Sequence, residues 1–118
     1  MPYPLALAVT LTVELPIYAG GLRAARLARA WAALAVALVV NLATHPLVWL
    51  ALRGAGSAYW PRFAAVEVAV WLAESLLILA WLGRVRVQGA PVFVALLALT
   101  ANGASCLAGL ALAVAAAP

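Results

Sequence analysis

The chain has 118 residues, of which 69% are hydrophobic and 8% are charged, and its mean hydropathy is +1.16. Soluble domains carry about 45–50% apolar and about 25% charged residues, whereas disordered chains are poor in apolar residues. This composition excludes both classes and predicts a small integral membrane protein. The formal net charge of +4 does not indicate a nucleic-acid partner, because the arginines lie in short connections between apolar runs.

Four apolar runs follow one another along the chain, at residues 4–20, 30–52, 63–82 and 91–115. A membrane-spanning helix needs about 17–25 apolar residues, and backbone groups in lipid must form their hydrogen bonds internally, so each run predicts a helix. The first run has no basic segment before it, which favours a mature helix over a signal peptide. We therefore expect an all-α, polytopic membrane protein, with one transmembrane domain over residues 1–118 that forms a four-helix bundle in the lipid bilayer.

The arginines are distributed unevenly between the connections. Five fall in the first and third connections and two in the second; they are Arg23, Arg26, Arg29, Arg84 and Arg86 against Arg53 and Arg62. Arginine is enriched in the cytoplasmic loops of membrane proteins. The distribution therefore predicts a multi-pass protein of the inner (cell) membrane, with connections one and three in the cytoplasm and both termini outside.

The two halves of the chain align at a nearly constant offset. Glu14 falls on Glu74 at an offset of 60 residues, and Asn41 falls on Asn102 at 61. Thr44 on Ser105 and Arg23 on Arg84 also give 61, and Arg26 on Arg86 gives 60. This pattern predicts two parallel helix-hairpin repeats around an axis along the membrane normal, as in some transporters. The alternative is coincidence, because an apolar sequence contains few polar residues to align.

Eight polar side chains inside the predicted spans are candidates for a proton, ion or substrate site: Glu14, Glu74, Glu67, Asn41, His45, Thr44, Asn102 and Ser105. All three acids of the chain are among them. A charge at the bilayer centre costs about 3 kcal/mol or more, so intramembrane acids face the bundle interior and by default indicate function. Low dielectric favours the neutral form of a carboxyl group, so these acids are candidate proton carriers.

Helix geometry assigns the polar residues to two layers. Glu14, Asn41, Glu74 and Asn102 each lie near the middle of a span, and we expect them to form one layer at the midplane. For the asparagines, with Thr44 and Ser105, the alternative is simple interhelical hydrogen bonding. The two glutamates favour a functional role, because Gln or Ser would join helices at a lower desolvation cost.

A second layer, nearer the outside, is expected to hold His45, Glu67 and Ser105. His45 either hydrogen-bonds Glu67 as a neutral imidazole or titrates. Cys106 and Gly109 follow Asn102 at helical spacing, and we expect both to serve close helix packing.

Motifs of catalysis and cofactor binding are missing from the sequence. It has no Gly-rich phosphate loop with Lys, no Cys/His pair at metal spacing and no Ser-His-Asp set. We expect no enzymatic activity, no catalytic residue, no metal and no cofactor.

The motifs Glu14-Leu15-Pro16, Asn41-x-x-Thr44-His45-Pro46, Glu67 with Glu74, and Asn102-x-x-Ser105 resemble a pattern in small four-helix bacterial membrane proteins of unknown function. The resemblance covers nearly the whole chain and implies the architecture, but no activity. The chain is also similar in length and helix number to the small multidrug resistance transporters. Their essential acid lies in the first helix, as Glu14 does here, and their antiparallel dimers exchange protons for cationic drugs. The acids of the third span and the arginine asymmetry depart from that family, so this likeness is an analogy only.

Two functions are compatible with the sequence. In the first, the chain is a proton- or cation-coupled transporter. Glu14 and Glu74 would be the protonation sites, Asn41 and Asn102 polar ligands, and His45 with Glu67 an outer relay. In the second, it is a non-catalytic subunit or assembly factor of a larger membrane complex, in which the same groups join helices. An enzyme accessory or lipid-binding role has only the arginines in its favour. Because four short helices enclose a narrow interior, we expect a homo-oligomer or a membrane-protein partner.

Overall fold

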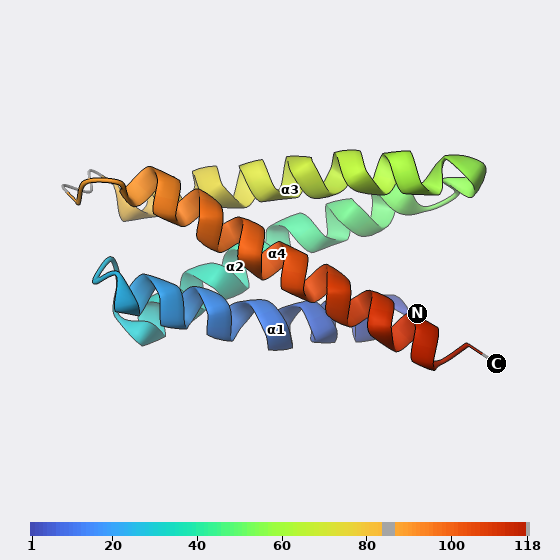
Figure 1. Ribbon diagram of the computed structural model, residues 1–118, viewed down its shortest axis with the longest axis horizontal. Helices are drawn as coiled ribbons and strands as arrows, with labels where there is room; N and C mark the ends of the chain where they lie inside the picture. Colours follow the sequence, from blue (N-terminus) through green and yellow to red (C-terminus); the bar gives the residue numbers. More distant parts are fainter. Residues whose placement is uncertain (84–86, 118) are drawn as a thin grey trace.

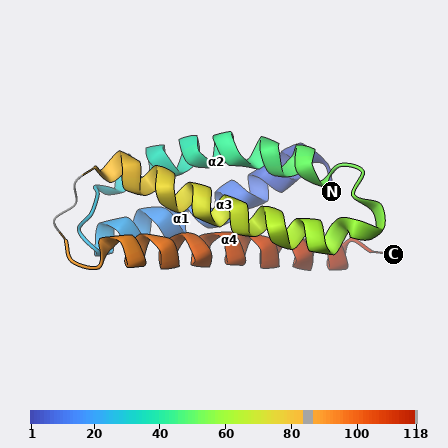
Figure 2. The same cartoon turned by 90° about the horizontal axis from the view of Figure 1, so that it is seen from above.

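The computed structural model describes residues 1–83 and 87–117. It contains four long helices, α1 (Tyr3–Ala24), α2 (Ala30–Leu52), α3 (Tyr59–Leu82) and α4 (Ala90–Ala115), and a 3₁₀ turn, η1 (Gly56–Ala58), before α3. Each long helix is long and apolar enough to cross a membrane, and the four run up and down beside one another (Figures 1 and 2). The expected all-α, four-helix membrane bundle is confirmed.

Two helices extend beyond the apolar runs from which they were predicted. α1 continues to Ala24 because Leu22 is fully buried in the bundle, so packing extends the helix past the end of the apolar run. α3 begins at Tyr59 and contains Pro61 in its first turn, where a backbone N–H would have no helical partner in any case. Gly83 ends α3 and Gly89 precedes α4, with φ of 69° and 79°, a conformation that glycine adopts without strain.

The helices form a square in which sequence neighbours pack against each other. α1 contacts α2 and α4, and α3 contacts the same two helices, so α1 and α3 lie on one diagonal and α2 and α4 on the other. Both termini and the α2–α3 connection lie at one end of the bundle, which we call the terminal end (Figure 1). The other end, where α1 and α3 finish, is called the arginine end.

The described arginines divide between these ends. Arg23, Arg26 and Arg29 lie in or beside the connection at the arginine end, and Arg53 and Arg62 flank the connection at the terminal end. The predicted cytoplasmic pair, Arg84 and Arg86, falls outside the described residues. The molecule is 49 Å long, which exceeds a hydrocarbon core of about 30 Å, so both sets of arginines can reach the headgroups.

The apolar core fills the half of the bundle nearer the arginine end. Its buried members are Tyr18, Ala19, Leu22, Ala33, Val36, Ala37, Val40, Ile78, Val94, Ala98 and Ala101. Five are alanines, and such small residues let membrane helices approach closely, which drives their association by van der Waals contact. Gly21 serves the same purpose between α1 and α4, because a Cβ at this position would collide with the side chain of Leu97.

Candidate functional site

The four residues predicted for the midplane are all buried inside the bundle. Glu14, Asn41 and Glu74 are each 1% exposed, and Asn102 is 7% exposed. One comes from each long helix. The bundle thus contains buried carboxyl groups that its own polar side chains surround.

Glu74 receives hydrogen bonds from all three other long helices. Its Oε2 accepts from the Tyr18 hydroxyl of α1 at 2.8 Å and from Asn102 Nδ2 of α4 at 2.7 Å. Its Oε1 accepts from Thr44 Oγ1 of α2 at 2.9 Å. Three such hydrogen bonds compensate part of the cost of burying the carboxyl group. Sequence reasoning missed Tyr18, although it follows Glu14 by four residues and so shares its helix face.

Among the residues that the structure describes, Glu14 has a single hydrogen-bond partner, a serine of α4. Ser105 Oγ of α4 lies 2.5 Å from Glu14 Oε1. The other oxygen, Oε2, is buried and has no hydrogen-bond partner within the described part of the chain. An unsatisfied buried oxygen is costly, so Glu14 is the carboxyl with a free position for a proton, a cation or a donor.

The hydroxyl–carboxyl bonds of the two halves correspond. Thr44 of α2 contacts Glu74 of α3, and Ser105 of α4 contacts Glu14 of α1. The two hydroxyls are 61 residues apart and the two carboxyls 60, so both bonds follow the offset predicted for the repeat. The square arrangement permits this, because a two-fold axis along the bundle exchanges α1 with α3 and α2 with α4.

The two asparagines correspond in one hydrogen bond and differ in another. Asn41 Nδ2 donates to Ala37 O and Asn102 Nδ2 donates to Ala98 O, at 3.0 and 2.9 Å. Asn102 also reaches Glu74. The halves differ most clearly at Tyr18, whose hydroxyl binds Glu74, because the residue 60 positions later is an isoleucine.

Ser105 lies nearer the midplane than the sequence predicted. We expected it in the outer layer, but it contacts Glu14. Side chains on a helix tilt toward its N-terminus, and α1 and α4 run in opposite directions (Figure 1). The Ser105 and Glu14 side chains therefore tilt toward each other and meet between their own levels.

The outer layer consists of two separate groups. Glu67 Oε2 accepts a hydrogen bond from Cys106 Sγ at 3.0 Å, not from His45. The His45 ring lies 5.4 Å from the Tyr3 ring, and its Nδ1 is buried with no partner among residues 1–83 and 87–117. Cys106 therefore acts as a hydrogen-bond donor beyond its expected packing role. Over the same residues, no group of three His, Cys, Asp or Glu side chains is placed to hold a metal ion.

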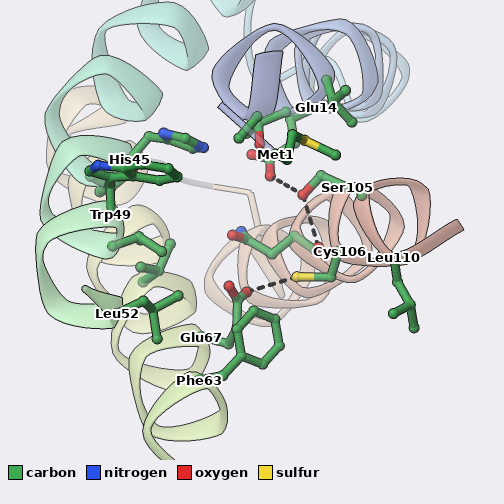
Figure 3. Close-up of a pocket in the computed structure, with 18 of the residues that line it drawn as sticks. Met1, Glu14, His45, Trp49, Leu52, Phe63, Glu67, Ser105, Cys106 and Leu110 are labelled. Atoms are coloured by element: carbon green, nitrogen blue, oxygen red, sulfur yellow. Dashed lines mark hydrogen bonds between the residues drawn. The ribbon is translucent and has the colours of Figure 1, made fainter. Parts of the chain in front are cut away.

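A cleft of about 390 Å³ runs from the carboxyl layer to the terminal end. All three glutamates line it, together with Asn41, Thr44, His45, Asn102 and Ser105, and none of its described lining residues is an arginine. Figure 3 shows His45 and Trp49 on the α2 side, facing Ser105 and Cys106 of α4 across the cleft. Gly109 also lines the cleft, and a Cβ there would meet nothing within 4 Å. Its expected role in close packing is wrong, because the helices diverge around the cleft.

Toward the arginine end, the described residues form the packed apolar core. Tyr18, Leu22, Ile78 and Val94 are fully buried beyond the carboxyl layer, where the apolar core is packed. The carboxyl groups are thus approached from the terminal end in this structure.

No protein-family model, curated protein or solved structure matches this chain. What the chain does is therefore argued from the site itself.

Proposed function

We propose that this chain is a small proton- or cation-coupled carrier without enzymatic activity, in which Glu14 and Glu74 bind and release the coupling ion. The carboxyls are buried in a multi-pass membrane protein, where a carboxylate is costly and marks function by default. The single observation that carries the proposal is that each central carboxyl contacts a serine or threonine hydroxyl, and that this hydroxyl also has a backbone oxygen within reach.

Ser105 illustrates this arrangement. Its Oγ lies 2.5 Å from Glu14 Oε1 and 3.0 Å from the backbone oxygen of Asn102. A serine hydroxyl has one proton and can also accept. When Glu14 is charged, the hydroxyl donates to it. When Glu14 is protonated, the carboxylic acid donates to Ser105 and the hydroxyl turns to the Asn102 oxygen. Both states are hydrogen-bonded, and only a hydroxyl rotation separates them.

Thr44 gives Glu74 the same property. Its Oγ1 lies 2.9 Å from Glu74 Oε1 and 3.1 Å from the backbone oxygen of Val40. Each carboxyl can therefore gain or lose a proton without leaving a buried hydroxyl unsatisfied, which would cost about 1–3 kcal/mol. The helix backbone offers the same acceptor to Thr12, Ser75 and Thr100. Thr44 and Ser105 differ from these residues because their alternative partner is a buried carboxyl group.

The packed apolar core on the arginine side of the carboxyls, formed by described residues, supports a carrier rather than a channel. The cleft reaches the carboxyls from the terminal end, whereas the apolar core is packed beyond them among the described residues, so transfer to the other side requires a second conformation. Parallel repeats provide one route, in which one hairpin rocks against the other around a central site. A second copy or a membrane partner would supply the rest of the path, since four helices enclose little space. The arginine distribution favours the inner membrane with the terminal end outside.

The proposal is tested by infrared titration of the purified protein in liposomes. The chain has three side-chain carboxyls, all glutamates, so the carbonyl band of a protonated carboxylic acid has few sources. We expect a pH-dependent band that Glu14→Gln and Glu74→Gln each diminish, and proton uptake under an inward proton gradient that both variants reduce to background. Thr100→Val is the matched control, because this hydroxyl bonds Leu96 O on the exposed face. A band without pH dependence, or variants that fold and titrate like the wild type, would overturn the proposal.

A further inference from the structure

A second hollow, which we call the lateral hollow, lies between α3 and α4 on the side of the bundle that faces the lipid. Its volume is about 260 Å³, and it is lined by Phe63, Glu67, Val68, Trp71, Leu99, Asn102, Gly103 and Cys106. Val68 and Leu99 are 52% and 49% exposed, and Gly103 is exposed as well. These residues lie well inside membrane-spanning helices, so the hollow faces the hydrocarbon of the bilayer.

The two hollows share residues. Phe63, Glu67, Asn102 and Cys106 line both the central cleft and the lateral hollow. Gly103 lies at the mouth, where a Cβ would meet nothing within 4 Å, so its missing side chain leaves the space open.

Toward the arginine end the gap between α3 and α4 is bridged by a hydrogen bond, from Trp71 Nε1 to Ala95 O at 2.7 Å. The lateral opening is therefore confined to the outer half of the bundle, where the cleft lies.

The chemistry of the cleft restricts what can occupy it. Glu14 Oε2 is buried, lines the cleft and has no partner in the described ranges, so it requires a proton donor or a cation. Glu67 and Glu74 line the same space, which disfavours an anionic head group. Between the carboxyls and the terminal end, the walls of the cleft are aromatic and aliphatic, with Trp49 and Leu110 on opposite sides. A polar floor below apolar walls is complementary to an amphiphile.

We propose that the cleft binds a membrane-dissolved amphiphile whose head carries N–H or O–H donors and no anionic group, and that this molecule enters from the bilayer past Gly103 between α3 and α4. The head lies beside Glu14 and Glu67, and the apolar body lies against the upper walls of the cleft or extends through the lateral opening into lipid. This inference rests on the proposed role of the carboxyls as a binding site and names the ligand class that they accept.

The native Cys106 provides a reporter, because it is the single cysteine of the chain and lines both hollows. The full-length protein in liposomes is treated with N-ethylmaleimide, and the rate of Cys106 labelling is measured with and without dodecylamine or dodecanol. At about ten times the dissociation constant, a bound amphiphile leaves about a tenth of the sites free, so labelling slows about tenfold. The two probes separate a cationic head from a neutral donor head. Dodecanoate, with an anionic head, is expected to leave the rate unchanged.

Two further comparisons test the lateral route. Butylamine has the same head as dodecylamine but partitions weakly into lipid, and we expect it to protect Cys106 poorly. Gly103→Phe fills the mouth, and we expect it to abolish protection by dodecylamine. The matched control is Gly20→Phe, which also lies in open space, on α1 away from both hollows. If Gly103→Phe does not fold, Leu99→Trp narrows the same mouth.

Protection by neither dodecylamine nor dodecanol, or equal protection by dodecanoate, would overturn the ligand class. Equal protection by butylamine, or full protection in the folded Gly103→Phe variant, would overturn the lateral route. Neither outcome affects the infrared titration of Glu14 and Glu74, so failure of this inference is distinguishable from failure of the proposed function. Conversely, protection that survives in a protein whose carboxyls do not titrate would indicate a binding site without proton coupling.

Discussion

Tyr18 makes the two central carboxyls unequal, because its hydroxyl donates to Glu74. The corresponding residue of the second half is Ile78, which has no hydroxyl to donate to Glu14. Tyr18→Phe removes this donor and keeps the ring that fills the core. Interhelical hydrogen bonds in membranes contribute roughly 0.6 kcal/mol on average, and bonds to charged groups contribute more. We expect a loss of about 1 kcal/mol in the free energy of unfolding, measured by denaturation in mixed micelles. Tyr59→Phe, at the half-exposed start of α3, should leave stability unchanged; an equal loss there would refute the assignment.

Thr44 has the second residue-scale role, since its hydroxyl serves either Glu74 or the Val40 oxygen. Thr44→Val preserves the shape and removes this alternation. We expect a stability loss of about 1–3 kcal/mol, because a buried oxygen loses its donor, and a changed infrared titration of the Glu74 carboxyl. Thr100→Val is the comparison, because that hydroxyl lies on the exposed face. If both valine variants titrate alike, the hydroxyl of Thr44 does not assist proton exchange.

At the residue scale, the sequence located the acids but not their partners. Glu14 and Glu74 could be predicted as interior groups because burying an acid in lipid is costly and must be compensated. Their donors depend on how the helices are rotated and at what height they pack, which hydropathy does not determine. Tyr18 could equally have faced lipid, and Ser105 was assigned to the wrong layer because side-chain tilt moves it toward Glu14.

At the scale of single helices, neighbouring glycines of α1 have different environments. A Cβ at Gly21 would collide with Leu97 of α4, whereas one at Gly20 meets nothing within 4 Å. Gly20→Ala should stabilise the protein by about 0.5–1 kcal/mol, because alanine favours helix. Gly21→Ala gains the same propensity but must displace the terminal methyl groups of the half-buried Leu97 side chain, so we expect a smaller net gain.

We therefore expect Gly21→Ala to be the less stable of the two variants in thermal unfolding. When both variants also carry Leu97→Ala, the collision is absent and we expect them to be equally stable. A Gly21→Ala protein as stable as Gly20→Ala would show that α1 and α4 do not approach closely here. The pattern of small residues predicted close packing at Gly109, where the helices diverge. Spacing alone does not distinguish a contact from a cleft.

At the scale of the whole molecule, the two halves of the chain have corresponding contacts. Four apolar runs are compatible with several packing orders. A two-fold repeat with an offset of 60–61 residues is compatible with α1 opposite α3, and the structure has this order, with Thr44–Glu74 and Ser105–Glu14 as corresponding contacts. The cleft could not be predicted, because it lies where α3 and α4 separate toward the terminal end (Figure 1), and no local sequence signal encodes that separation.

The orientation of the bundle decides from which compartment the cleft receives protons, and this is a property of the whole chain. The first and third connections carry more arginines than the second connection, which lies at the terminal end. This distribution predicts that the terminal end is outside. A phosphatase that is active only outside the cytoplasm should therefore be active when fused after Ala117 and inactive when inserted in the α1–α2 connection. Replacing Arg23, Arg26 and Arg29 by glutamine leaves two arginines on each side, so we expect about half of the molecules to invert. The matched variant, Arg53→Gln with Arg62→Gln, should retain full activity. An inactive C-terminal fusion would place the cleft toward the cytoplasm, and the carboxyls would then take up their ion from inside the cell.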